Sequence, residues 1–271
     1  MLTKSGYEIA ENTPESAEYL EFEGVHLYTV LHSALNPVAR VLLVGPFASE
    51  RNYSYAPWVQ WARYLAKRHI ETLRFDYRGV GESTGAFEDM TISRWSEDVE
   101  FLASRLQSRS PSVPLVLHGL ELGALLASRA FKAGIGRAVL LWAPPNTANE
   151  VLRAALLRQV AGDQAFKDNA ARRPLSAFVQ QLEQDQPVEV EGYPLTGRLW
   201  RESFELKLLL TADGECSGGH GRRSWRSVTL GRNTRPLVGP AGLRFTDIIN
   251  PDLSDLFRDN FDWLAGVLDA K

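Results

Sequence analysis

Short apolar runs alternate with longer stretches of helical periodicity through the first half of the chain. The strand-like runs cover residues 38–44, 72–75 and 138–142, and a fourth begins at Leu115; the helical stretches cover residues 57–68, 91–106 and the alanine- and leucine-rich segment after Gly123. Regular alternation of this kind predicts an α/β fold, in which a mostly parallel central sheet is covered by helices on both faces.

The two ends of the chain add elements of other kinds. Residues 18–33 alternate between apolar and polar positions around Gly24, which predicts an antiparallel strand pair. Residues 253–268 carry apolar side chains at helical spacing and predict a terminal helix.

The middle of the chain is charged and alanine-rich, with helical periodicity from about Asn149 to Gln184. We interpret it as a helical cap inserted over the carboxyl ends of the strands. The chain then divides into residues 1–145 as the N-terminal part of the core, 146–205 as the cap, and 206–271 as a shortened C-terminal part.

The pattern weakens in the last third, where residues 213–233 are rich in Gly, Arg and Ser. Residues 225–230 and 235–238 have the composition of two late strands. The segment between them is too short for the helix that joins parallel neighbours. Either the sheet is shortened here or the two runs do not lie parallel side by side.

Composition narrows the classes of partner. The chain has 271 residues, 44% of them hydrophobic and 23% charged, with a formal net charge of -3. This balance provides no basic field for nucleic acid or an anionic membrane, and no apolar run approaches the ~20 residues of a membrane span. We therefore expect a cytoplasmic protein with a small-molecule ligand, and leave its oligomeric state open.

The sequence gives little support for a metal site or a disulfide bond. The chain has one cysteine, Cys216, and its five histidines show no metal-ligand spacing. We expect neither a metal site nor a cofactor.

Candidate chemistry gathers at the turn after the strand that begins at Leu115. Gly119 and Gly123 flank this turn, and Glu121 stands at its tip. A strand, a glycine-flanked turn and a helix outline a nucleophile elbow, whose tip normally carries a serine hydroxyl. The sequence therefore predicts a hydrolase-like turn with a carboxylate in the nucleophile position.

Three features of the sequence resemble the α/β-hydrolase superfamily: the glycine-rich turn at residues 76–83, the elbow, and the apolar strand that follows it. Within this superfamily, residues 46–52, 119–127 and 141–144 are similar to the hydrolase-like proteins associated with exosortase A systems, where the elbow serine can also be missing. The resemblance extends over residues 38–160. It implies an α/β-hydrolase fold with a cap.

The resemblance also implies a catalytic histidine on a loop after the last strand, where this chain has Leu243. Two of the three members of a Ser-His-Asp triad are then absent. The only histidine downstream of the elbow is His220, which could form a displaced site with Asp213 or Glu215 as its acid. A solvated glycine loop is the simpler interpretation. We expect His118, inside the elbow strand, to have a packing role.

Glutamate is long enough to fold back onto the amides that hold an oxyanion in a hydrolase. These would be the Leu122 amide and that of Phe47 or Ala48, because Pro46 has no N–H. Glu50 and Asn52 are expected at the mouth of the pocket. If backbone donors and a nearby Arg51 or Arg78 are available, we expect Glu121 to stay ionised; otherwise it becomes a neutral acid or a proton-transfer group.

Three functions remain open from the sequence. The first is a degenerate hydrolase-fold protein without the Ser-His pair, which binds a small acyl or ester-like ligand or assists a partner enzyme. The second is an unconventional hydrolase or transferase that uses Glu121 as carboxylate nucleophile or general base. The third is an active esterase whose triad is displaced to His220 and Asp213.

Overall fold

The computed structural model of the protein describes residues 14–166, 172–210, 212–218, 221–229 and 253–269. Three features singled out in the sequence lie outside the described residues: His220, Leu243 and the strand-like run at 235–238.

An eight-stranded sheet forms the centre of the molecule, in the order β1-β2-β4-β3-β5-β6-β10-β9. The strands are β1 Glu15–Phe22, β2 Val25–His32, β3 Ala39–Val44, β4 Ile70–Phe75, β5 Leu115–Leu120, β6 Ala138–Trp142, β9 Gly214–Gly218 and β10 Gly221–Val228. The five strands from β4 to β10 in this order are parallel to one another, whereas the pairs β1–β2, β2–β4 and β9–β10 are antiparallel. The predicted, mostly parallel sheet is confirmed.

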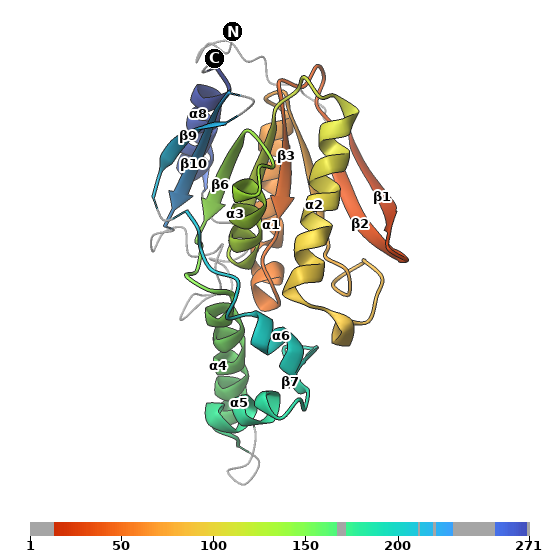
Figure 1. Ribbon diagram of the computed structural model, residues 1–271, viewed down its shortest axis with the longest axis vertical. Coiled ribbons are helices and arrows are strands. Elements are labelled where there is room, and N and C mark those ends of the chain that lie inside the picture. The colour runs from red at the N-terminus through yellow and green to blue at the C-terminus, as the bar shows by residue number, and fades with distance from the viewer. Residues whose placement is uncertain (1–13, 167–171, 211, 219–220, 230–252, 270–271) are drawn as a thin grey trace.

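Helices cover both faces of this sheet (Figure 1). The helices α2 Ile92–Arg109 and α3 Leu122–Lys132 lie on one face, and α1 Ser49–Ala66 and α8 Ser254–Asp269 lie on the other. A single turn of 3-10 helix, η1 Phe87–Asp89, precedes α2. Within the described part of the chain, no helix is long and apolar enough to span a membrane.

The helix α1 begins earlier than the sequence predicts. The apolar periodicity predicts a helix over residues 57–68, but α1 starts at Ser49 and contains Pro57. The turn before Pro57 is held by the Ser54 hydroxyl, which donates to the Glu50 carbonyl across 2.7 Å. Because α1 starts at Ser49, Glu50 and Arg51 lie in its first turn and not in a loop before it.

The glycine-rich segment after residue 213 forms strands, which corrects our interpretation of a solvated loop. β9 and β10 pair antiparallel as a hairpin, and β10 pairs parallel with β6. The position next to β10 is therefore filled by the strand that precedes it in the chain. This placement removes the need for a crossover helix.

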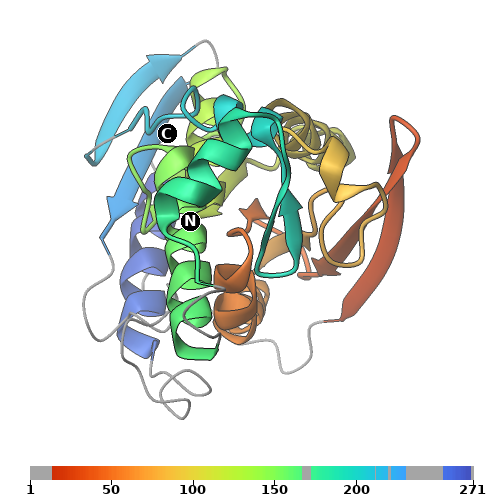
Figure 2. The same ribbon diagram turned by 90° about the horizontal axis from the view of Figure 1, so that it is seen from below.

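Beyond the carboxyl ends of the strands lie three helices and a small hairpin (Figures 1 and 2). They are α4 Ala148–Phe166, α5 Leu175–Glu183, α6 Gly197–Glu202, and the strands β7 Val188–Val190 and β8 Tyr193–Leu195. The hairpin was not predicted. Glu191 and Gly192 both have a positive φ, of 52° and 87°, as the tight turn of a two-residue hairpin requires.

Candidate functional site

Glu121 lies between β5 and α3 with an unusual backbone conformation, φ 53° and ψ -116°. Positive φ is strained for a residue with a Cβ and persists only where its surroundings fix it. A Cβ on Gly123 would lie 2.0 Å from the Val44 carbonyl oxygen, and a Cβ on Gly119 would lie 2.4 Å from the Ala124 Cα. The two glycines let β3, β5 and α3 approach closely enough to hold the turn.

One oxygen of the Glu121 carboxylate accepts two backbone hydrogen bonds. The Leu122 amide donates to Oε2 across 2.8 Å, and the Phe47 amide donates to the same atom across 3.2 Å. The carboxylate therefore folds back as the sequence predicts, and Phe47 is the second donor.

The other oxygen, Oε1, has no hydrogen-bond partner among the residues that the structure describes. It is not one of the fully enclosed polar atoms without a partner, and the residue as a whole is 8% exposed. Oε1 is therefore the accessible oxygen of this carboxyl group.

The loop that places the Phe47 amide next to Glu121 is held before and after Phe47, at Gly45 and at Ala48. The buried Tyr77 hydroxyl donates to the Gly45 carbonyl across 2.7 Å. Ala48, which precedes α1, is buried and has φ 53° and ψ -132°. Burial, with smaller contributions from Glu121 and Asp98, raises the pKa of Tyr77 well above its usual value, so the hydroxyl stays neutral.

An ion-pair network joins this loop to the cap. Arg158 on α4 donates from Nε to Glu191 Oε1 across 2.5 Å, and its Nη1 lies 3.3 Å from Glu50 Oε1. Glu191 Oε2 in turn accepts the Ser49 amide across 3.0 Å. The hairpin turn, α4 and the start of α1 are thereby connected next to Glu121.

The arginine of this network is not one that the sequence suggested. Arg51 forms a bidentate pair with Asp76, its Nη2 lying 2.7 Å from each carboxylate oxygen. Arg78 forms a buried pair with Asp98, with 2.7 Å between Nε and Oδ1. Both arginines stabilise the glycine-rich turn after β4. The arginine that acts electrostatically on Glu121 is Arg158.

The surroundings of Glu121 favour its neutral form. Burial is the largest cause, and it raises the pKa of the Glu121 carboxyl from 4.5 to about 8. The nearby Glu50 also raises this pKa, whereas the amides of Leu122 and Phe47 and the charge of Arg158 lower it. Near pH 7 most molecules then carry a protonated Glu121. This is the outcome expected when neither Arg51 nor Arg78 is near.

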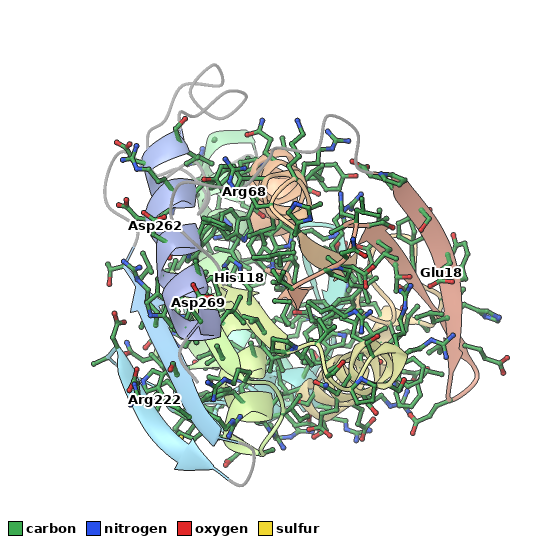
Figure 3. The ribbon with its side chains drawn as sticks, turned by 90° about the horizontal axis from the view of Figure 1, so that it is seen from above. Glu18, Arg68, His118, Arg222, Asp262 and Asp269 are labelled. Atoms are coloured by element: carbon green, nitrogen blue, oxygen red, sulfur yellow. The ribbon has the colours of Figure 1, made fainter. Side chains whose placement is uncertain are left out.

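His118 has the predicted packing role. Its Nδ1 accepts the Trp61 indole N–H across 2.8 Å, and its ring contacts Trp58 and Trp142 edge to face. Burial lowers the pKa of His118 well below 6.5. Figure 3 shows it in the interior of the molecule, whereas Glu18 and Arg222 lie at the periphery.

The structure gathers some of the predicted site residues and separates others. Phe47, Leu122 and Glu50 lie around Glu121. Asn52 is exposed on α1. Asp213 is exposed beside β9, three strands from β5, where its Oδ1 accepts the Ser227 amide across 2.9 Å.

A small cleft of about 30 Å³ lies against the loop after β3 that carries Phe47. It is lined by Gly45, Pro46, Arg51, Ser54, Tyr55, Trp58, Arg74, Phe75, Asp76 and Tyr77. A cleft of this size has room for about one or two water molecules. Within the described ranges, no three His, Cys, Asp or Glu side chains are grouped to hold a metal ion.

Comparisons with known proteins agree with this architecture. The family described as "Serine aminopeptidase, S33" matches residues 50–186, about half of the chain. Among curated proteins there is no match.

Two solved structures match over more of the chain, and a third matches over about half. Alpha/beta hydrolase domain-containing protein 10 from mouse is 16% identical with a TM-score of 0.55, over 93% of this chain and 99% of that one. Est1E from Butyrivibrio proteoclasticus, solved with ferulic acid bound, is 19% identical with a TM-score of 0.50, over 71% and 72%. An alpha-beta serine hydrolase homologue from Coxiella burnetii is 17% identical with a TM-score of 0.42. That match covers 48% of this chain and 63% of the length of the Coxiella protein. These likenesses concern the fold.

Proposed function

We propose that this chain, which belongs to the S33 serine aminopeptidase family of α/β-hydrolase proteins, binds a small acyl or ester-like ligand without serine-dependent acyl transfer. One observation carries the proposal: Glu121 Oε2 accepts both the Phe47 and the Leu122 amide. In a serine hydrolase, paired amides beside the nucleophile stabilise the oxyanion that forms during attack. We interpret Glu121 as the occupant of that position.

The rest of a serine mechanism finds no support around Glu121. The tip of the turn has no hydroxyl. Three described histidines have other partners: His32 lies beside Glu15 and Arg74, His69 beside the Leu35 carbonyl, and His118 beside Trp61. The fourth, His26, is exposed on β2, at the opposite side of β4 and β3 from the elbow strand. A displaced triad is also disfavoured, because Asp213 already serves the β9–β10 region as an acceptor.

Ligand binding accounts better for the site than assistance to a partner enzyme does. The accessible Oε1 without a partner is a polar atom that a ligand can satisfy. It lies at the carboxyl ends of the parallel strands, where α/β proteins bind small molecules. The grouping with exosortase A-associated proteins and a cytoplasmic location remain part of this proposal.

A second candidate function deserves a test because the pKa of Glu121 is raised to about 8. A carboxyl group with a pKa near the working pH is suited to proton transfer. In this alternative, Oε1 acts as general base or as carboxylate nucleophile, while the two amides hold Oε2.

Two measurements separate these functions. A fluorophosphonate probe followed by intact-mass analysis should leave the wild-type protein unlabelled, and labelling of any serine would overturn the proposal. Turnover of ester, epoxide, haloalkane and acyl-thioester substrates should stay at background in wild type and Glu121→Gln alike. Turnover in the wild type that is lost in Glu121→Gln would establish the second candidate.

A further inference from the structure

We infer that Glu121 Oε1 is the ligand-contacting atom and that it donates a hydrogen bond to the carbonyl oxygen of an uncharged amide or ester. This inference rests on the proposed function and names the class of its ligand. The argument comes from the partners of the two carboxyl oxygens and from the charges around them.

The two amides determine which oxygen carries the proton. Oε2 receives an N–H from Leu122 and another from Phe47. An oxygen that accepts two donors is the carbonyl-type oxygen of a neutral acid, because a hydroxyl hydrogen would compete with them. The proton of neutral Glu121 therefore lies on Oε1, which can donate it to an acceptor.

The charges around Glu121 disfavour an anionic ligand. Glu50 from α1 and Arg158 from α4 both act electrostatically on Glu121, and Arg158 is also paired with Glu191 of the hairpin. Among these described groups one guanidinium faces three carboxyl groups. Tyr77, another titratable neighbour, donates to Gly45 and stays neutral. A ligand carboxylate would add negative charge to this cluster, whereas a neutral carbonyl adds only an acceptor.

Protonation then controls ligand binding. Below the raised pKa of about 8 the Oε1–H donor is present, and above it the ionised carboxylate repels a carbonyl oxygen. Glu50 raises this pKa, so its replacement should move the loss of binding to lower pH.

The test measures binding of straight-chain primary amides, from acetamide to decanamide, by protein-observed NMR or calorimetry. At least one amide should bind wild type at about pH 6.5, and should bind at least about tenfold more weakly at about pH 9.5, because the competent neutral form is then rare. The carboxylates of the same chain lengths should bind more weakly than the amides at both pH values.

Two variants sharpen the test. Glu121→Gln keeps an acceptor for the two amides and an NH₂ donor in place of Oε1–H, so amide binding should persist and lose its pH dependence. Glu50→Gln should retain binding with a midpoint at lower pH than in wild type.

Three results would overturn the inference: no binding by any amide of the series, stronger binding of the carboxylates, or amide binding in wild type that does not change with pH. The matching p-nitrophenyl esters show which idea has failed. Turnover of an ester refutes the proposed function itself, whereas absent turnover with absent amide binding refutes only the assigned ligand class.

Discussion

The backbone amide of Phe47 donates to the carboxylate of Glu121 across 3.2 Å, although 74 positions separate the two residues in the chain. This contact joins the loop after β3 to the turn after β5. It places a titratable side chain where the two loops meet, so the protonation of that side chain should affect stability and the proposed ligand binding.

Stability should fall as the pH rises. The pKa of Glu121 is raised from 4.5 to about 8, so between these values the unfolded chain ionises at this position while the folded protein stays protonated. The contribution of the neutral carboxyl is complete below 4.5 and is lost as the pH rises through 8. In Glu121→Gln this loss should disappear, a difference from wild type on the order of 4 kcal/mol across the range.

Urea unfolding between pH 5 and pH 9 measures this difference. Glu18→Gln is the matched control, since Glu18 is exposed on β1 at the edge of the molecule (Figure 3). It should follow the wild-type curve. A Glu121→Gln curve with the same slope as wild type would show that Glu121 is not the buried acid described here.

Restoring a serine at the turn should not restore an esterase. Glu121→Ser frees the Phe47 and Leu122 amides, yet the described histidine on the same strand, His118, is held by Trp61. Without a base, p-nitrophenyl ester hydrolysis should stay within about tenfold of background, that is, within about 1.4 kcal/mol of barrier. A larger gain would mean that a base reaches residue 121 from elsewhere in the chain.

Gly123 should be the least replaceable position of the turn. In Gly123→Ala the new methyl group would meet the Val44 and Gly45 carbonyl oxygens, at 2.0 and 2.5 Å, and neither is free to move. We expect a loss of about 1 to 3 kcal/mol in the free energy of unfolding. We also expect weaker protection of the Phe47 amide in hydrogen exchange.

Gly162 provides the control for that substitution. It lies within α4, and nothing lies within 4 Å of a Cβ placed on it. Gly162→Ala should stabilise the protein by about 0.5 to 1 kcal/mol, because alanine favours a helix over glycine. Equal effects at the two glycines would contradict the tight packing of the turn.

The buried pair between Arg78 and Asp98 should matter more than exposed pairs. Asp98 accepts both the Arg78 backbone amide and its Nε, and both side chains are enclosed. Asp98→Asn leaves a buried guanidinium with reduced compensation and should cost about 3 to 5 kcal/mol in denaturant unfolding. Asp255→Asn removes the exposed pair with Arg258 and should change stability by less than about 0.5 kcal/mol.

His118 should not titrate in the range where histidines usually do. Burial lowers its pKa well below 6.5, and the Trp61 N–H fixes Nδ1 as an acceptor. Its ring nitrogens should therefore report a single neutral tautomer, protonated at Nε2, by ¹⁵N NMR from pH 5 to pH 8. A titration midpoint near 6.5 would show that water reaches the space between His118 and the rings of Trp58, Trp61 and Trp142.

Local patterns in the sequence were enough to find the centre of the site. The glycine-flanked turn locates Glu121, and the absence of an N–H on Pro46 narrows the second donor to Phe47 or Ala48. Both inferences use residues whose chemistry is tied to backbone geometry. The same is true of the main strands, whose continuous apolar runs distinguish buried parallel strands from their surroundings.

The charge network could not be predicted in this way. Arg158 and Glu191 meet only because the cap folds over α1, and nothing local distinguishes Arg158 among the 30 Lys and Arg residues. Arg51 and Arg78 were better candidates by proximity to the motifs, yet each has an acidic partner in or near the glycine-rich turn.

Short strands were missed for a related reason. β7 and β8 have three residues each, and β9 consists of small and polar residues at the edge of the sheet. These strands are defined by pairing within hairpins. An apolar pattern does not define them, so the spacing of hydrophobic residues does not reveal them.

The position of α8 after every strand of the described sheet has a consequence for how the protein forms. All eight strands of the described sheet leave the ribosome before α8, because β10 ends at Val228 and α8 begins at Ser254. The sheet can pair while the face with Trp61 and Trp142 still lacks Phe257, which contacts both rings. In this order α8 docks onto a described sheet whose strands are already paired. A chain that stops before Ser254 should expose an aromatic surface and self-associate.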